Sequence, residues 1–114
     1  MREESVVIPS INRTIVFKIG KNAKDNHDII DEASGDDMWF HVDERTSCHI
    51  IASIPEDITR KEMKYIIKQG AVLCKKYSYP NIKKLGINYA RIKNVTKTEV
   101  PGEVIVKEES KIVI

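Results

Sequence analysis

The sequence predicts an α+β domain: a mostly antiparallel sheet with one long amphipathic helix packed on it and a shorter helix nearer the N-terminus. Short β-branched and aromatic runs alternate with turn residues, and one long helical stripe follows a capping signal at Thr59. The 114 residues suffice for one core. We therefore expect a single domain over residues 1–114, a size that disfavours an enzyme with an interdomain cleft.

The first half of the chain predicts a strand followed by a short helix. Residues 14–20 (TIVFKIG) are β-branched and aromatic and end in a glycine, which is typical of a strand. Apolar or small side chains then recur every three or four residues over residues 23–33, which indicates a helix. The polar stretch at residues 34–37 contains a glycine and ends this helix in a turn.

Residues 38–42 and 48–53 predict a β-hairpin around a polar turn. In the expected register His41 faces His49 across the two strands. Because side chains alternate between the faces of a sheet, Trp39 shares the face of the two imidazoles. The intervening apolar side chains line the opposite face.

The second half predicts the longest helix and the remaining strands. Thr59 and Glu62 form a capping box before an apolar stripe that runs from residue 63 to residue 77. Pro101 and Gly102 predict a turn among the short β segments near the C-terminus. These later strands are expected at residues 87–92, 104–106 and 112–114. The last of them is expected to form an exposed sheet edge.

The charge of the chain is unevenly distributed although the formal net charge is only +2. Residues 1–59 carry 6 basic and 12 acidic side chains, for a net charge of −6. Residues 60–98 carry 11 basic side chains and one acidic side chain, for a net charge of +10, and residues 99–114 carry −2. A basic block of this kind favours an anionic partner such as nucleic acid.

Nothing in the sequence indicates export or membrane insertion. No apolar run approaches the roughly 20 residues of a membrane helix, and the charged N-terminus precedes only a short apolar patch. We expect a cytoplasmic protein without membrane contact. Cys48 and Cys74, the two cysteines, are then expected to be free thiols, and Cys74 to lie in the core.

Catalytic signatures are weak. His41, His49 and Asp43 leave open a metal-dependent nuclease or hydrolase, because two cross-strand imidazoles and a carboxylate can converge on a cation. Cys48 and His49 point to opposite sheet faces and are therefore poor joint ligands. No nucleophile elbow or P-loop is present. We expect neither a metal nor a cofactor, and no enzymatic activity.

Nucleic-acid binding is the function that charge and aromatic content favour. Lysines along a helix can follow phosphates, and aromatic side chains can stack on bases. The predicted phosphate contacts are Lys21, Lys24, Lys64, Lys68, Lys75 and Lys76. Trp39, His41 and His49 are predicted to form the polar-aromatic surface nearest any specific contact. The alternative binding class is a protein-interaction adaptor whose acidic N-terminal half docks a basic partner.

Four ordered motifs resemble one known family. They are the G-K-N-A-K-D-N segment at residues 20–26, the D-M-W-F-H-V segment at 37–42 followed by Cys48-His49-Ile50, the N-Y-A-R-I-K-N-V segment at 88–95, and P-G-E-V at 101–104. Together they resemble the NFACT-R domain, the RNA-binding module of the NFACT proteins. Ser47 stands where the family commonly has glycine. In this respect the sequence is more similar to the small coiled-coil-domain proteins that carry the module.

The resemblance implies RNA binding without catalysis. The large NFACT proteins act on stalled large ribosomal subunits and engage tRNA, and their other domains have no counterpart in this sequence. The implied partners are tRNA or ribosomal RNA, with DNA, the ribosome and its associated proteins as further candidates, in translation or ribosome-associated quality control. The motifs add four residues to the predicted RNA contacts: Asn22, Asn26, Arg91 and Lys93.

Overall fold

The computed structural model describes residues 2–114 and contains eight strands, two α-helices and two short 3-10 helices within that range. In chain order they are β1 (Arg2–Ile8), η1 (Pro9–Ile11), β2 (Arg13–Gly20), α1 (Ala23–Glu32), β3 (Met38–Val42), β4 (His49–Ala52), α2 (Arg60–Lys76), β5 (Gly86–Arg91), η2 (Ile92–Asn94), β6 (Val95–Lys97), β7 (Val104–Val106) and β8 (Ser110–Val113). The α+β class predicted from the sequence is confirmed. Neither helix in this range combines the length and apolar character that crossing a bilayer requires.

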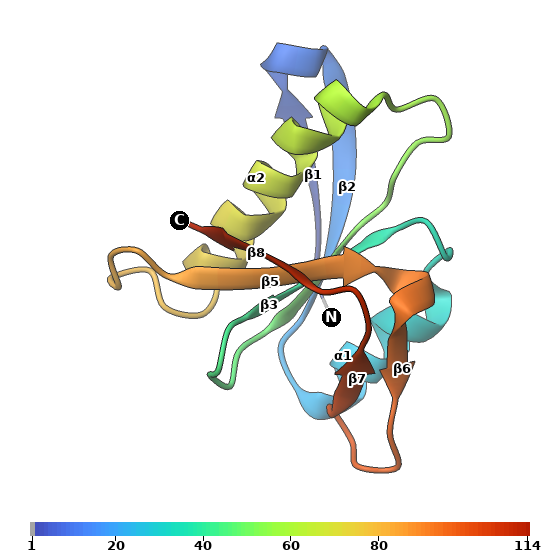
Figure 1. Cartoon of the computed structure of the whole chain (residues 1–114), viewed down its shortest axis with the longest axis vertical. Helices are drawn as coiled ribbons and strands as arrows, with labels where there is room; N and C mark the ends of the chain where they lie inside the picture. Colours follow the sequence, from blue (N-terminus) through green and yellow to red (C-terminus); the bar gives the residue numbers. More distant parts are fainter. Residues whose placement is uncertain (1) are drawn as a thin grey trace.

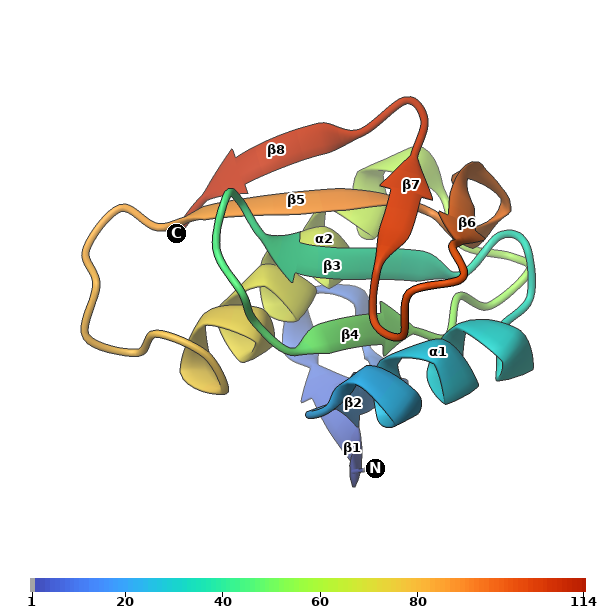
Figure 2. The same ribbon diagram turned by 90° about the horizontal axis from the view of Figure 1, so that it is seen from below.

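Six strands form one antiparallel sheet in the order β1-β2-β4-β3-β5-β8, and β6 pairs with β7 in a separate two-stranded sheet. The large sheet is strongly twisted, so that β1 and β2 run nearly across the direction of β5 and β8 (Figure 1). The α2 helix covers one face of this sheet. The α1 helix and the β6–β7 hairpin lie on the other face (Figure 2).

The α2 face holds the larger core. Thr59 and Glu62 make the predicted capping box, with side-chain-to-backbone hydrogen bonds in both directions, so α2 begins at the residue after Thr59. In the middle of the helix, Gly70 allows the ring of Phe40 to lie against the helix backbone. A Cβ at Gly70 would come within 2.3 Å of that ring. This close approach seats α2 directly on β3.

The opposite face buries a second, smaller apolar cluster. Ile29 and Ile30 of α1 pack there with Trp39 and Ile51 from the central hairpin, as the predicted alternation of side chains requires. The β6–β7 hairpin covers the rest of this cluster and contributes Val95. The central sheet is therefore buried on both sides, and this second cover holds the C-terminal turn beside α1.

Two strands were not predicted. β1 pairs with β2 along its whole length, although its sequence begins with charged residues. An edge strand tolerates such residues because one side of it faces solvent. β6 has only three residues and is specified by its pairing with β7, so that Pro101 and Gly102 form the turn between these two strands. The other elements lie within one to three residues of their predicted ends, and β8 is the predicted edge strand.

The two cysteines lie on the α2 side, as free thiols. Cys74 is fully buried on the apolar face of α2, as predicted. The Sγ atom of Cys48 lies 3.8 Å from the carbonyl oxygen of Cys74 and 3.1 Å from the hydroxyl of Ser78. The backbone N–H of Cys48 also donates to the Ser78 hydroxyl. These contacts tie the end of α2 to the start of β4.

Candidate nucleic-acid interface

Three of the four sequence motifs meet at one pocket. It has a volume of about 580 Å³ and opens where β2 ends and α1 begins. Its lining residues come from the start of α1, the central hairpin with its turn, and the turn between β6 and β7; they are Lys21, Asn22, Ala23, Asn26, His41, Glu44, Arg45, Thr46, Ser47, His49, Pro101 and Gly102. Five predicted site residues are therefore brought together: Lys21, Asn22, Asn26, His41 and His49.

The start of α1 is held against the sheet by two asparagines and a glycine. The side chain of Asn22 accepts a hydrogen bond from the backbone N–H of Asp25 and caps the helix. Asn26, one turn later, is buried and accepts from the backbone N–H of His49 at 3.3 Å. A Cβ at Gly20 would lie 2.3 Å from Oδ1 of Asn26, so only glycine permits this approach. Both asparagines therefore have structural roles at the pocket wall.

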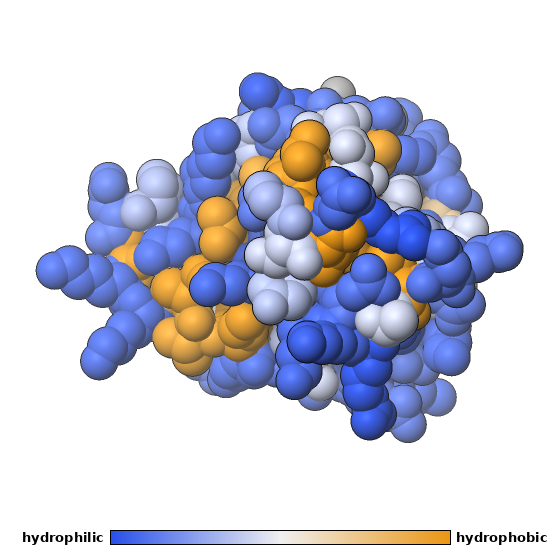
Figure 3. All heavy atoms as spheres, turned by 90° about the horizontal axis from the view of Figure 1, so that it is seen from above, coloured by the Kyte–Doolittle hydropathy of each residue, from blue (hydrophilic) through white to orange (hydrophobic). Residues whose placement is uncertain are grey.

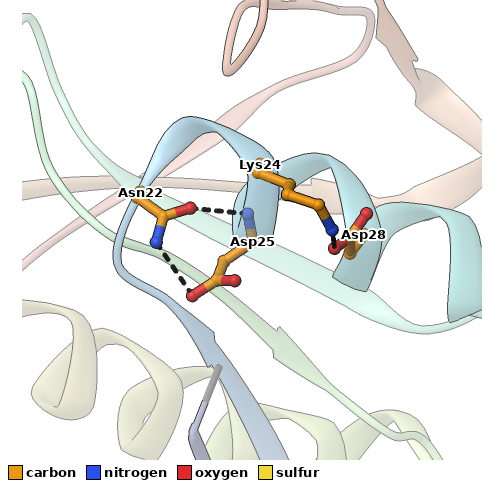
Figure 4. A network of polar contacts seen from close by, with 4 residues as sticks. All are labelled: Asn22, Lys24, Asp25 and Asp28. Atoms are coloured by element: carbon orange, nitrogen blue, oxygen red, sulfur yellow. Dashed lines mark hydrogen bonds and ion pairs between the residues drawn. The ribbon is translucent and has the colours of Figure 1, made fainter.

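The first turn of α1 carries a compact polar network (Figure 4). Asn22 also donates through Nδ2 to the carboxylate of Asp25 at 3.3 Å. Lys24 makes an ion pair with Asp28 one turn further along, at 2.7 Å. Lys24 is a predicted phosphate contact. Its ammonium group points along α1 and is paired with the carboxylate of Asp28. Lys24 is not among the residues that line the pocket.

His49, one of the residues that line the pocket, is hydrogen-bonded to a second aromatic side chain, Trp39. The indole N–H of Trp39 donates to Nδ1 of His49 at 3.1 Å. Because an indole N–H can only donate, Nδ1 of His49 accepts, and the neutral ring carries its proton on Nε2. Burial of the ring lowers the pKa of His49 to about 3. His49 is therefore a neutral imidazole that presents Nε2–H.

His41 and His49 face each other in the predicted register. Their ring centroids lie 5.0 Å apart at an interplanar angle of 90°, and the His41 ring lies parallel to the Trp39 ring at 5.7 Å. Burial also lowers the pKa of His41. Both imidazoles are thus uncharged at neutral pH, which suits hydrogen bonding.

Trp39 is more enclosed than the two histidines with which it was grouped. Its side chain is 2% exposed and packs with Ile29 and Ile51 beneath α1. A base cannot stack on a ring that is covered in this way. Trp39 orients His49 and lines an adjoining pocket with both histidines, and its place in the contact surface stays a prediction.

The turn between β6 and β7 closes one side of the pocket. Gly102 has a φ angle of +83°, and its N–H donates to Nε2 of His27 in α1 at 3.0 Å. A Cβ at this position would approach Ala23 to 3.1 Å. A side chain at residue 102 would therefore be strained by the backbone angle as well as crowded. These features explain why a Pro-Gly pair occurs at the rim.

Four cationic side chains lie against the rings of two tyrosines just after α2. Arg2, Lys21 and Lys76 each lie 5.3 Å from the centroid of the Tyr77 ring. Arg45 lies at the same distance over Tyr79. Lys21 and Arg45 also line the pocket, so the two groups are continuous with it. Arg2 and Arg45 were not predicted as site residues, because nothing in their local sequence indicates that the chain brings them here.

The other α2 lysines lie away from the pocket. Lys64 and Lys68 are exposed, and neither makes an ion pair with another described residue. Lys64 is about 18 Å along the helix axis from Lys76, at a rise of 1.5 Å per residue. Lys75 is partly buried and donates to the backbone carbonyl of Ile114 at 3.2 Å. The N-terminal half of α2 therefore carries lysines without ion pairs to other described residues. At the end of the helix, Lys76 shares the Tyr77 ring with Lys21.

The two remaining predicted contacts lie on a different part of the surface. Arg91 donates to the backbone carbonyl of Asp36 at 2.6 Å. The Nζ atom of Lys93 lies 4.0 Å from the carboxylate of the same residue. Both are therefore engaged at the turn that precedes β3, and neither lines the pocket beside α1.

Comparison with known proteins identifies the family. The family model described as "NFACT protein RNA binding domain" matches residues 7–110. No curated protein sequence matches the chain closely enough to count as a relative. Among solved structures, the C-terminal part of the fibronectin/fibrinogen-binding protein from Streptococcus suis is similar, with a TM-score of 0.81 and 16% identity. That similarity covers 100% of this chain and 45% of the other, and it shows a shared fold. The family match spans nearly the whole of the folded chain, which therefore belongs to the NFACT protein RNA-binding domain family.

Proposed function

We propose that this protein binds RNA as a single domain, without catalysing a reaction on it, and that lysines supply most of the affinity through phosphate contacts. The observation that carries the proposal is the family match over residues 7–110. The charge distribution supports it, because residues 60–98 carry a net charge of +10. A basic or apolar partner surface would not require this concentration of cations.

The N-terminal half of α2 is the proposed RNA-contacting face. Lys61, Lys64 and Lys68 are exposed at spacings of three and four residues, so they form one stripe on the solvent side of the helix. Unpaired cations of like sign repel one another, and an anionic ligand removes that repulsion. At the end of the molecule that carries η1 and the start of α2, hydrophilic atoms surround a broken band of hydrophobic atoms (Figure 3). The hydrophilic part of this surface suits a polar ligand.

We further propose tRNA or ribosomal RNA as the physiological target, in translation or ribosome-associated quality control in the cytoplasm. The support is the resemblance of the motifs to a module of proteins that act on ribosomal subunits. DNA is a weaker candidate for the same lysines, because phosphate contacts alone do not distinguish the two nucleic acids. The ribosome and its associated proteins are the corresponding larger partners.

The hydrogen bonding of His49 supports a binding function over a metal-dependent nuclease. A histidine binds a metal through a ring nitrogen that offers a lone pair. Trp39 occupies Nδ1 of His49, and the neutral ring then carries hydrogen on Nε2. A metal at His41 and His49 would have to break the Trp39 bond or remove a second proton. The adaptor alternative has no comparable observation in its favour.

Fluorescence anisotropy with labelled tRNA, at two or more salt concentrations, tests the proposal. We expect Lys64→Glu with Lys68→Glu to weaken binding and to reduce the salt slope by about 0.7–0.9 for each phosphate that the variant no longer neutralises. The control is Lys83→Glu with Lys107→Glu, which changes net charge equally at exposed positions elsewhere. Absent or salt-independent binding by the wild-type protein would contradict the proposal. Equal weakening by both double variants would reject α2 as the contact face.

A further inference from the structure

We propose that the pocket beside α1 binds a phosphate group of one RNA nucleotide, held by Nε2–H of His49, the first backbone N–H groups of α1 and Lys21. This inference rests on the proposed RNA binding and adds a defined ligand unit to it. It is separate from the lysine stripe of α2, which lies on the other side of the sheet. The pocket, unlike that stripe, contains a buried and directed hydrogen-bond donor.

The donor is His49. The residue is only 2% exposed, and its Nδ1 is already taken by Trp39. Among residues 2–114, no side chain or backbone group makes a hydrogen bond to its Nε2, and no unpartnered side-chain nitrogen is fully enclosed. Nε2–H is therefore accessible, and His49 lines both this pocket and an adjoining one that shares His41 and is also lined by Glu103 and Glu109. A donor on so buried a ring, without an acceptor in the described chain, is available to water or a ligand.

The start of α1 supplies more donors at the same place. The backbone N–H groups of Ala23, which lines the pocket, and of Lys24, the next residue and outside the lining, are in the first turn and have no acceptor within the helix. The cap from Asn22 serves Asp25 and leaves these two N–H groups available. β2 and β4 pair Gly20 directly with His49, and α1 begins three residues after Gly20, so both sets of donors lie at one end of the sheet. The positive end of the helix dipole also favours an anion there.

The charge of the pocket favours a phosphate. Lys21 and Arg45 line it as cations and Glu44 as the acidic residue, for a net charge of +1. The carboxylate of Asp25 is hydrogen-bonded to Asn22 and is not part of the lining. The two histidines are neutral donors in this environment and add no competing charge. The volume of about 580 Å³ exceeds what phosphate alone requires and falls in the range of small-ligand sites, so a whole nucleotide can enter with its phosphate toward α1.

Titration of the full chain with uridine 5′-monophosphate, followed by NMR, tests this site directly. We expect shifts in the backbone amides of Ala23 and Lys24 and in the Nε2–H resonance of His49. Lys21→Gln should weaken binding about tenfold, the size expected for one charge-assisted contact. The matched control, Lys107→Gln, removes an exposed lysine elsewhere and should change affinity less than about twofold. Lys21 is exposed, so its replacement leaves the core intact.

His49→Gln provides a second variant, because an amide can accept from Trp39 and still donate into the pocket. We expect it to retain most of the nucleotide affinity, whereas His49→Leu should lose it. Uridine without phosphate should bind at least about tenfold more weakly than the monophosphate, since the charged contacts are missing. The dinucleotide UpU, which carries only an internal phosphodiester, distinguishes an internal phosphate from a terminal one. Binding of either phosphate-bearing probe at the α1 amides supports the site.

Two outcomes would overturn the inference. One is the absence of shifts at Ala23, Lys24 and His49 with both phosphate-bearing probes; the other is equal binding of uridine and its monophosphate. Neither outcome touches the proposed RNA binding, which the tRNA titration and the α2 variants measure independently. Conversely, monophosphate binding without any tRNA binding would reject the RNA function and leave an isolated phosphate pocket.

Discussion

Replacing Trp39 by phenylalanine isolates the hydrogen bond that orients His49. The change removes the indole N–H but keeps an aromatic ring in the cluster beneath α1. Nδ1 of His49 then becomes a buried acceptor without its donor, because the bond of 3.1 Å is the hydrogen bond that the structure gives this atom. The perturbation therefore tests whether this hydrogen bond stabilises the fold and fixes the tautomer of His49.

The expected loss of stability has two parts. Leaving a buried acceptor unsatisfied costs about 1–3 kcal/mol. The smaller ring leaves a partial cavity at a site that is only 2% exposed, which adds about 1 kcal/mol. Rotation or tautomer exchange of His49 can recover part of the first amount, since the freed ring can place its proton on either nitrogen. We therefore expect a net destabilisation of about 2–3 kcal/mol from these parts.

Urea denaturation measures this loss, and ¹⁵N NMR of the imidazoles reports the tautomer. Wild-type His49 should show the Nε2–H form alone, and Trp39→Phe should show a mixture. Tyr89→Phe is the control, because Tyr89 is a half-buried aromatic whose hydroxyl makes no hydrogen bond with the described residues. It should change stability by less than about 0.5 kcal/mol. A loss below about 0.5 kcal/mol in Trp39→Phe, with an unchanged tautomer, would refute the role given to this bond.

Three further predictions concern Gly70, Asn22 and His49. Gly70→Ala should lower the melting temperature, because a Cβ at this position would lie 2.3 Å from the Phe40 ring. The overpacking costs about 1–3 kcal/mol, whereas the gain in helix propensity is about 1 kcal/mol. An unchanged or higher melting temperature would show that Phe40 can move. Asn22→Ala should remove about 1 kcal/mol of cap energy and speed hydrogen exchange in the first turn of α1, whereas Asn81→Ala in an exposed loop should do neither. The pKa of His49 lies at about 3 in the folded protein and near 6.5 when unfolded, so only the unfolded chain gains this proton between those values and acidification destabilises the fold by up to about 1.4 kcal/mol per pH unit. Urea denaturation of wild type and His49→Gln between pH 4.5 and 6.5 measures this slope, and an equal slope in both proteins would contradict it.

Local patterns were sufficient to predict the main elements of the fold. The capping box at Thr59 places the start of α2 to the residue, because both of its hydrogen bonds are made within four residues of sequence. The alternation of side chains in the central hairpin places His41 opposite His49, because pairing in a short hairpin leaves few registers. Strand β1 was missed because its charges are unusual for a strand and are tolerated only at a sheet edge, a position that becomes known when the whole sheet is assembled.

The candidate site was predictable only in part. The histidine pair and the motif at the start of α1 were recognised, but each was a separate signal along the chain. Their meeting depends on the pairing of β2 with β4 and on the turn at Gly102 docking against α1, both of which are long-range contacts. The burial of Trp39 was not predictable because the sequence does not reveal that a second layer, formed by α1 and the β6–β7 hairpin, covers that face of the sheet.

The reactivity of the Cys48 thiol reports local opening of the fold without any added label site. It is 7% exposed and lies where the segment after α2 meets the start of β4, whereas Cys74 is fully enclosed. Hydrogen bonding to the Cys74 and Ser78 side chains lowers the pKa of Cys48, which increases the fraction that reacts with an alkylating reagent. Labelling of Cys48 then requires only that this segment lifts away, and labelling of Cys74 requires α2 to leave the sheet. One alkylation time course on the unmodified chain thus separates local breathing near the pocket from global unfolding.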